Sequence, residues 1–259
     1  MMHCIKKRFQ MKAEHYLIVS ADDFGLVPSV TEGIIEGLSN GCITETNYIA
    51  TSDYCVEAAR LAKINQINHM GIHLNLEIGR SCYNGSKLPN EIMIVGTSEY
   101  YEWVEKEFFA QCEYLLNQGL ILTHLTYHKN IIIDYKMADI IIKIAQFYDV
   151  PIRRVTDERL NTYLTNAGIK MPDKRISNVV GIDYSINYLY ESLKISNGNN
   201  SSVVEVICHP GYLSEELSKV SSLDTSRLKE LKLFTDLQTI CMIRKEGYKL
   251  KNYSILGEK

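Results

Sequence analysis

The chain has 259 residues, of which 46% are apolar, and a formal net charge of −3. A near-neutral chain without long runs of one charge gives no electrostatic reason to expect nucleic acid or an anionic membrane surface as a partner. No apolar run approaches the length of a membrane span. The first 14 residues are basic but lack the apolar core of a secretory signal, so we expect a short leader outside the folded domain.

The first predicted strand, at 16–20, is a β-branched apolar run of the kind that is buried on both faces. Asp22 and Asp23 follow it directly. Adjacent carboxylates repel each other, so a bound cation would relieve the repulsion. The alternative is a turn in which one of the two caps the next helix. Within that helix, Ser29 and Glu32 have the spacing of a capping box.

The rest of the chain alternates between strands and helices. Further strands are predicted at 43–50, 70–76, 120–125, 150–155, 178–182, 203–208 and 248–253. Helices are predicted at 29–40, 56–63, 99–118, 135–148, 186–195 and 224–246, with Asp134 capping the fourth. The segment 79–97 is rich in loop residues and unusually long, which makes it a candidate lid over a site.

This alternation predicts an α/β fold built from parallel βαβ units. Seven or eight units without a Pro-, Gly- or Ser-rich linker predict one domain over residues 1–259, folded as a closed or nearly closed (β/α) barrel. Seven cysteines are spread irregularly along the chain. An odd set without paired spacing is typical of reduced thiols, which predicts a cytoplasmic protein.

Most of the histidines and several charged residues fall at the carboxyl ends of predicted strands, and in a parallel barrel these ends share one rim, where active sites lie. The residues concerned are Asp22, Asp23, His73, His124, His128, Arg153, Arg154 and His209. One carboxylate and two imidazoles would suit a divalent ion with positions left for water and substrate. Taken singly, each has a structural alternative: His73 and His124 as core histidines, the arginines as surface charges, and His209 as a turn residue.

Four motifs, ADDFG at 21–25, GIHLNLEIG at 71–79, THLTYHKN at 123–130 and ICHPGY at 207–212, resemble the YdjC-like carbohydrate deacetylases, of the chitooligosaccharide deacetylase type. The resemblance implies a (β/α) barrel related to the polysaccharide deacetylases and one divalent metal ion, Zn²⁺ or Mg²⁺. The implied substrate is an N-acetylated mono- or oligosaccharide, from which an acetyl group is removed.

The resemblance also implies roles for particular residues. Asp23, His73 and His128 would be the metal ligands. Asp22 would be the base for a metal-activated water, although the two aspartates could exchange roles. His209 would be the acid, and Arg153 would orient the base. Departures from the family pattern at Thr126, Tyr127, Asn130 and Val155 are expected to affect substrate preference and to weaken the support around the metal.

Two other classes of function stay open on the sequence alone. One is a metal-dependent enzyme of different chemistry, such as an iron oxygenase with a facial triad or a phosphoesterase. The other is a sugar-binding protein on a barrel that has lost activity. Metal analysis together with an assay for acetate release would separate them. The sequence leaves the sugar, the native ion and the number of subunits open, and a homo-oligomer is compatible with it.

Overall fold

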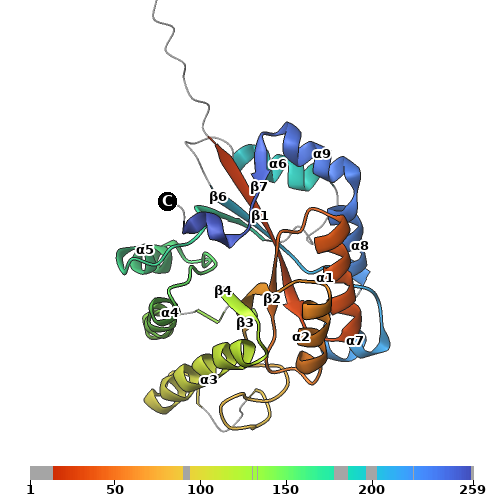
Figure 1. Cartoon of the computed structure of the whole chain (residues 1–259). Coiled ribbons are helices and arrows are strands. Elements are labelled where there is room, and N and C mark those ends of the chain that lie inside the picture. Colours follow the sequence, from red (N-terminus) through yellow and green to blue (C-terminus); the bar gives the residue numbers. More distant parts are fainter. Residues whose placement is uncertain are drawn as a thin grey trace, which may run out of the picture.

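The computed structural model describes residues 14–89, 94–129, 131–132, 134–177, 186–196, 203–223 and 225–257 (Figure 1). Its strands are β1 (His15–Phe24), β2 (Glu45–Tyr48), β3 (His69–Leu74), β4 (Ile121–Tyr127), β5 (Lys174–Ile176), β6 (Val203–Cys208) and β7 (Tyr248–Leu250). Its helices are α1 (Pro28–Asn40), α2 (Cys55–Ile64), α3 (Ser98–Asn117), α4 (Tyr135–Tyr148), α5 (Glu158–Asn166), α6 (Ile186–Ser196), α7 (Glu215–Val220), α8 (Thr225–Thr235) and α9 (Leu237–Lys245), followed by the 3₁₀ turn η1 (Tyr253–Leu256).

The seven strands form one sheet in the order β4-β3-β2-β1-β6-β5, and β7 pairs with the first residues of β1. Every pairing between these strands is parallel, as the alternation of strands and helices predicts. The helices lie around the outside of this curved sheet, with α1 packed between α2 and α8 (Figure 1). The carboxyl ends of the strands therefore meet at one edge, which is where the predicted site residues fall.

A side chain, rather than a strand ladder, spans the gap between the two outer strands in the described part of the chain. Ile152 pairs with Leu125 of β4 through a single bridge, so the strand predicted at 150–155 is reduced to this contact. On the opposite border, Arg175 of β5 donates to the hydroxyl of Tyr127 (3.1 Å) and to the carbonyl of Arg154 (3.0 Å). The sheet is thus curved like a barrel, with a seam held by the Arg175 guanidinium.

Side chains alternate between the two faces of β1, and this alternation builds the interior. Leu17, Val19 and Ala21 belong to the main core between the sheet and the helices. Ile18 belongs instead to a smaller apolar cluster that includes Tyr253 of η1. The strand thus faces the helices with one set of residues and the barrel interior with the other, which is why the whole run is apolar until it reaches the site.

The turn η1 lies against β4 and packs on Ile18 and Val203, near the starts of β1 and β6 rather than at the strand ends that carry the site residues. The ring of Tyr253 stacks on the ring of His124, with centroids 3.7 Å apart and an interplanar angle of 9°. Both side chains are fully buried. The interpretation of His124 as a structural histidine is therefore confirmed.

Several local expectations need correction. The predicted helix at 224–246 is two helices, because Asp236 caps α9 through its side chain. The capping box at Ser29 does not form: α1 begins at Pro28, and the Ser29 hydroxyl contacts that of Ser214 instead. Helices α5 and α7 were not predicted. The Asp134 cap is confirmed, since its side chain accepts from the Met137 N–H.

Other expectations fall partly or wholly outside the described residues, namely the strand at 178–182 and residues 1–13 of the predicted leader. Cys4 is among those residues, and the other six cysteines are all free thiols. Among the described helices, none combines the length and the apolar character that crossing a bilayer requires.

Candidate metal and catalytic site

Two neighbouring aspartates point into the same site at the end of β1, although successive side chains of a strand normally point to opposite faces. The pairing of β1 with β2 shifts register between Ala21 and Phe24. Asp23 has a φ of 74°, in the left-handed region that Asp tolerates better than most residues. This irregularity turns the Asp23 carboxylate toward the side already occupied by Asp22.

Asp22 is held at both carboxylate oxygens. Arg153 donates to them through two nitrogens, at 2.7 and 2.8 Å, and Asn47 of β2 donates to Oδ1 at 2.7 Å. Burial opposes ionisation of Asp22, but the Arg153 guanidinium outweighs it and lowers the pKa of this carboxyl below its usual range. Asp22 is therefore an oriented carboxylate that stays ionised at neutral pH.

The guanidinium of Arg153 is also held by partners other than Asp22. Its Nε donates to Glu205 of β6 at 2.9 Å, and one terminal nitrogen donates to the Ser20 hydroxyl at 3.1 Å. Its side chain is fully buried, so it is no surface charge. A bidentate arginine with its own carboxylate partner is a rigid support, because both ends of the guanidinium are engaged.

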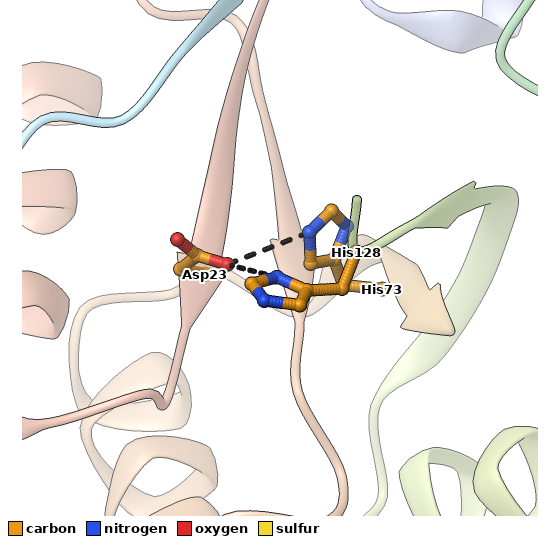
Figure 2. A group of neighbouring side chains, drawn as sticks. All are labelled: Asp23, His73 and His128. Atoms are coloured by element: carbon orange, nitrogen blue, oxygen red, sulfur yellow. Dashed lines mark hydrogen bonds and ion pairs between the residues drawn. The ribbon is translucent and has the colours of Figure 1, made fainter. Parts of the chain in front are cut away.

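Asp23, His73 and His128 come together from β1, β3 and the residue after β4 (Figure 2). The Asp23 Oδ1 atom lies 3.4 Å from His73 Nε2 and 3.1 Å from His128 Nδ1. One ligand atom from each residue lies within 4.8 Å of the others. Bonds of about 2.0–2.2 Å around a tetrahedral ion place neighbouring ligand atoms about 3.4 Å apart, so these residues fit an ion such as zinc.

The hydroxyl of Thr126 is a hydrogen-bond partner of His73. It lies 2.8 Å from His73 Nδ1 and 3.2 Å from the Ile72 carbonyl, so by donating to that carbonyl it can accept the Nδ1 proton. Burial lowers the pKa of His73 to about 4, which keeps the ring neutral at pH 7. With the proton on Nδ1, the lone pair of Nε2 is available to bind an ion beside Asp23, whose Oδ1 lies 3.4 Å away. Thr126 was expected to weaken the support around the metal, and in the structure it is instead a hydrogen-bond partner of the candidate ligand His73.

His128 has a different environment, since its side chain is partly exposed. Burial alone would lower the pKa of His128, but the hydrogen bond and the charge of Asp23 outweigh it and raise the pKa above its usual value. A proton on Nδ1 can thus occupy the position of a cation between His128 and Asp23. Metal binding would have to displace that proton, so metal affinity at this site should fall at acid pH.

His209 also lies beside the carboxylate of Asp22. Its Nε2 is 3.8 Å from Asp22 Oδ2, and its backbone N–H donates to the buried carboxyl of Glu230 on α8. Its Nδ1 is buried and has no hydrogen-bond partner among the described residues. Burial lowers the pKa of His209, and the carboxylates of Asp22 and Asp23 offset this only in part.

Arg227 is a site residue that the sequence did not reveal. It belongs to α8, is fully buried, and donates to Asp23 Oδ2 at 2.6 Å. Asn47, Glu205 and Glu230 were missed as well. No motif marks them, and a charged residue in an amphipathic helix or strand is normally a surface residue.

Two other predicted residues lie away from the centre. Arg154 forms an ion pair with Glu158 and is no part of the cluster. Tyr127 donates its hydroxyl to the Arg154 carbonyl at 3.0 Å, in the seam between the outer strands. Asn130 lies outside the described residues.

The first part of the candidate lid at 79–97 is tied to α3. The carboxylate of the fully buried Glu107 accepts from the backbone N–H groups of Cys82 and Tyr83, at 3.0 Å each, and from the Ser81 hydroxyl at 2.5 Å. Three hydrogen bonds to one buried carboxylate hold this part of the loop in place. The structure therefore does not support a movement of residues 81–83 as a lid over the site.

An all-parallel α/β sheet with one carboxylate and two imidazoles beyond its strand ends defines an α/β-barrel protein with a candidate mononuclear metal centre. The family model described as YdjC-like protein matches residues 16–245. The chain belongs to the YdjC-like family.

Curated relatives and solved structures are similar to the chain over most of its length. The chain is 29% identical to a carbohydrate deacetylase of Clostridium beijerinckii, covering 92% of this chain and 98% of that protein. It is 31% identical to a carbohydrate deacetylase of Oceanobacillus iheyensis, covering 85% and 96%.

A crystal structure from Enterococcus faecalis V583, described as a candidate cellobiose-phosphate cleavage protein, has a TM-score of 0.82 at 26% identity and covers 94% of this chain and 99% of that one. A lactam utilization protein from Thermus thermophilus shares the fold, with a TM-score of 0.54 at 12% identity over 92% of this chain and all of that one.

Proposed function

We propose that this protein is a metal-dependent carbohydrate deacetylase that hydrolyses the acetamide of an N-acetylated mono- or oligosaccharide. The observation that carries the proposal is the convergence of Asp23, His73 and His128 beside the oriented carboxylate of Asp22. The relatives from Clostridium and Oceanobacillus are carbohydrate deacetylases, which supports the same chemistry. Asp23, His73 and His128 are the proposed ligands of one divalent ion, Zn²⁺ or Mg²⁺.

An amide resists attack by water, and a bound divalent ion would supply a Lewis acid that polarises the carbonyl and acidifies water. The residues of the chain have separate tasks. Asp22 is the proposed general base: its carboxylate stays ionised because of Arg153, and it lies within 3.8 Å of both His73 and His209. Asn47 and Arg153 fix the direction of its lone pairs, so the proton acceptor is in position before substrate arrives.

His209 is the proposed general acid. An amine leaves poorly unless it is protonated, so a donor is needed near the base but distinct from it. His209 Nε2 is 3.8 Å from Asp22 Oδ2, so the proposed acid and the proposed base lie next to each other and can reach the same amide from one side. Its lowered pKa makes the imidazolium a stronger donor while it reduces the protonated fraction at neutral pH.

The test combines metal analysis with an assay for acetate. The purified protein is expected to hold about one divalent ion per chain and to release acetate from N-acetylglucosamine oligomers. Stripping the ion with a chelator should abolish release, and adding Zn²⁺ back should restore it. Bound metal with no acetate from mono- or oligosaccharides would favour a metal enzyme of different chemistry. Sugar binding by a protein that takes up no metal would favour a non-catalytic binding protein.

A further inference from the structure

Arg227 reaches the proposed metal site from the helix α8, which is remote in sequence from the proposed ligands Asp23, His73 and His128. Its Nη2 donates to Asp23 Oδ2 at 2.6 Å, across a sequence separation of 204 residues. Its Nε donates to the Leu223 carbonyl at 3.0 Å, which fixes the plane of the guanidinium. The side chain is 1% exposed, so the contact is made away from solvent.

The two oxygens of Asp23 therefore have different partners. Oδ1 faces the imidazole nitrogens of His73 and His128, and Oδ2 is bonded to Arg227. We propose that Arg227 is a positioning residue that limits Asp23 to one metal-binding oxygen and thereby sets which ion the site prefers. This inference rests on the proposed metal site, and it concerns the choice of ion rather than the reaction.

The physical basis is the number of ligand atoms that each ion requires. Zinc is satisfied by three protein ligands and one open position in catalytic sites. Magnesium demands octahedral geometry and oxygen ligands. When Arg227 occupies Asp23 Oδ2, the site offers one carboxylate oxygen and two imidazole nitrogens, a ligand set that suits zinc. Freeing Asp23 Oδ2 would add an oxygen ligand and let the carboxylate rotate, which weakens the arrangement for zinc and improves it for magnesium.

A purely structural reading of Arg227 would be charge compensation for a buried carboxylate. That role predicts a lower stability of the metal-free protein when Arg227 is replaced, but it predicts no change in the relative affinities for two ions. The ratio of zinc to magnesium affinity therefore separates positioning from simple support, and it is measured without any turnover.

The experiment uses the full chain stripped of metal and titrated with Zn²⁺ or Mg²⁺ in competition with a chromogenic chelator. R227M should lose about 10–100-fold in zinc affinity, the range typical for partners of metal ligands, and its zinc-to-magnesium ratio should fall. R227K keeps a donor for Asp23 Oδ2 and should recover part of the loss. K232M removes a positive charge from an exposed position of the same helix and should match the wild type.

A zinc affinity and a zinc-to-magnesium ratio in R227M equal to those of the wild type would overturn the inference. If R227M does not fold, R227K decides in the same way: an unchanged ratio overturns the inference, and a smaller fall in the same direction supports it. A wild-type protein that binds neither ion would instead refute the proposed metal site, so the two failures are distinguishable.

Discussion

Gly33 of α1 lies directly against Gly211, two residues after His209. A Cβ atom at Gly33 would be 2.6 Å from the Gly211 Cα, and the nitrogen of Gly211 would be 3.1 Å away. These are backbone atoms, so they have no flexible end that can move aside. The loop is bonded on both flanks, because the Gly211 N–H donates to the Arg227 carbonyl and the Tyr212 N–H donates to the Ser29 carbonyl. The position of the proposed acid is thus set by the absence of a side chain on α1.

Gly33→Ala is therefore expected to shift the loop that carries His209, lowering kcat about tenfold or more and stability by about 1–3 kcal/mol, the usual cost of overpacking. The measurements are kcat for acetate release and urea unfolding. The matched control is Gly37→Ala on the same helix, where the new Cβ meets only the side-chain end of Ile43. That variant should lose stability while kcat stays near wild type. Equal effects of the two variants on kcat would contradict this account.

Asp22→Asn should reduce turnover by a factor of about 10³ or more, because the amide cannot take the proton that a general base must accept. Metal binding should persist, since the proposed ligands are Asp23, His73 and His128. The measurements are kcat and metal content by elemental analysis. Full activity in the metal-loaded variant would remove Asp22 from the reaction.

His209→Ala should lower kcat while leaving KM for a chitooligosaccharide within a few-fold of wild type, because the acid acts on the leaving amine rather than on substrate binding. A substrate analogue with a better leaving group than a sugar amine should recover part of the lost rate. A variant that hydrolyses both substrates at the wild-type rate would exclude the acid role.

Thr126→Val removes the acceptor for the His73 Nδ1 proton while keeping the shape of the side chain. Metal affinity should fall about 10–100-fold, because the ring loses the bond that fixes its tautomer and orientation. Thr126→Ser keeps the hydroxyl and should bind metal nearly as well as the wild type. Chelator competition measures both affinities. Equal affinities of the valine and serine variants would show that the hydroxyl is irrelevant to the ligand.

The buried carboxyl of Glu45 should make stability depend on pH. Burial raises the pKa of Glu45 to about 8 from a usual value of 4.5. A carboxyl whose pKa is higher in the folded state contributes stability that is present below pH 4.5 and lost as pH rises toward 8, at up to about 1.4 kcal/mol per pH unit.

Glu45→Gln cannot titrate, so its free energy of unfolding should fall less steeply than that of the wild type between pH 5 and 8. Urea unfolding of both proteins across this range gives the difference. Parallel curves would mean that Glu45 is ionised in the folded protein.

The sequence predicted the five central residues, Asp22, Asp23, His73, His128 and His209, because each follows or ends an apolar strand run. Parallel strands deliver such positions to one edge, so order along the chain is enough to bring them together. The parallel direction of the strands is therefore enough to assign these five residues to one cluster, without any interatomic distance. The same argument could not say which aspartate turns toward the imidazoles, because that depends on the left-handed φ of Asp23.

The rest of the site could not be predicted, for a physical reason. Arg227 lies among other charged residues of a helix, where such a pattern normally marks the solvent face. Glu205 sits within an apolar strand, and its purpose appears only once Arg153 is found beside it. Sequence patterns report which face of an element is apolar, but not which buried charges meet across the interior.

The fold shows the same limit in its helices. The periodicity of 224–246 runs through Asp236 without interruption, so it predicted one helix, whereas the side chain of Asp236 begins a second one. At Ser29 the opposite occurred: a capping pattern was present, but Pro28 already starts the helix and Ser29 turns to Ser214. At Asp236 a local hydrogen bond overrides the helical periodicity, and at Ser29 a tertiary contact overrides the capping pattern.

Tyr253 lies in the last described turn of the chain, yet its ring stacks on that of His124, in the strand that leads to the proposed ligand His128. The segment therefore covers the part of the interior beside His124, where Glu205 and the guanidinium of Arg153 lie. Truncation of the protein before Tyr253 would expose this part of the interior to water. An affinity tag attached after Gly257 would extend from an exposed position. Fragments and fusion proteins should accordingly retain the turn η1 if the geometry of the proposed site is to be kept.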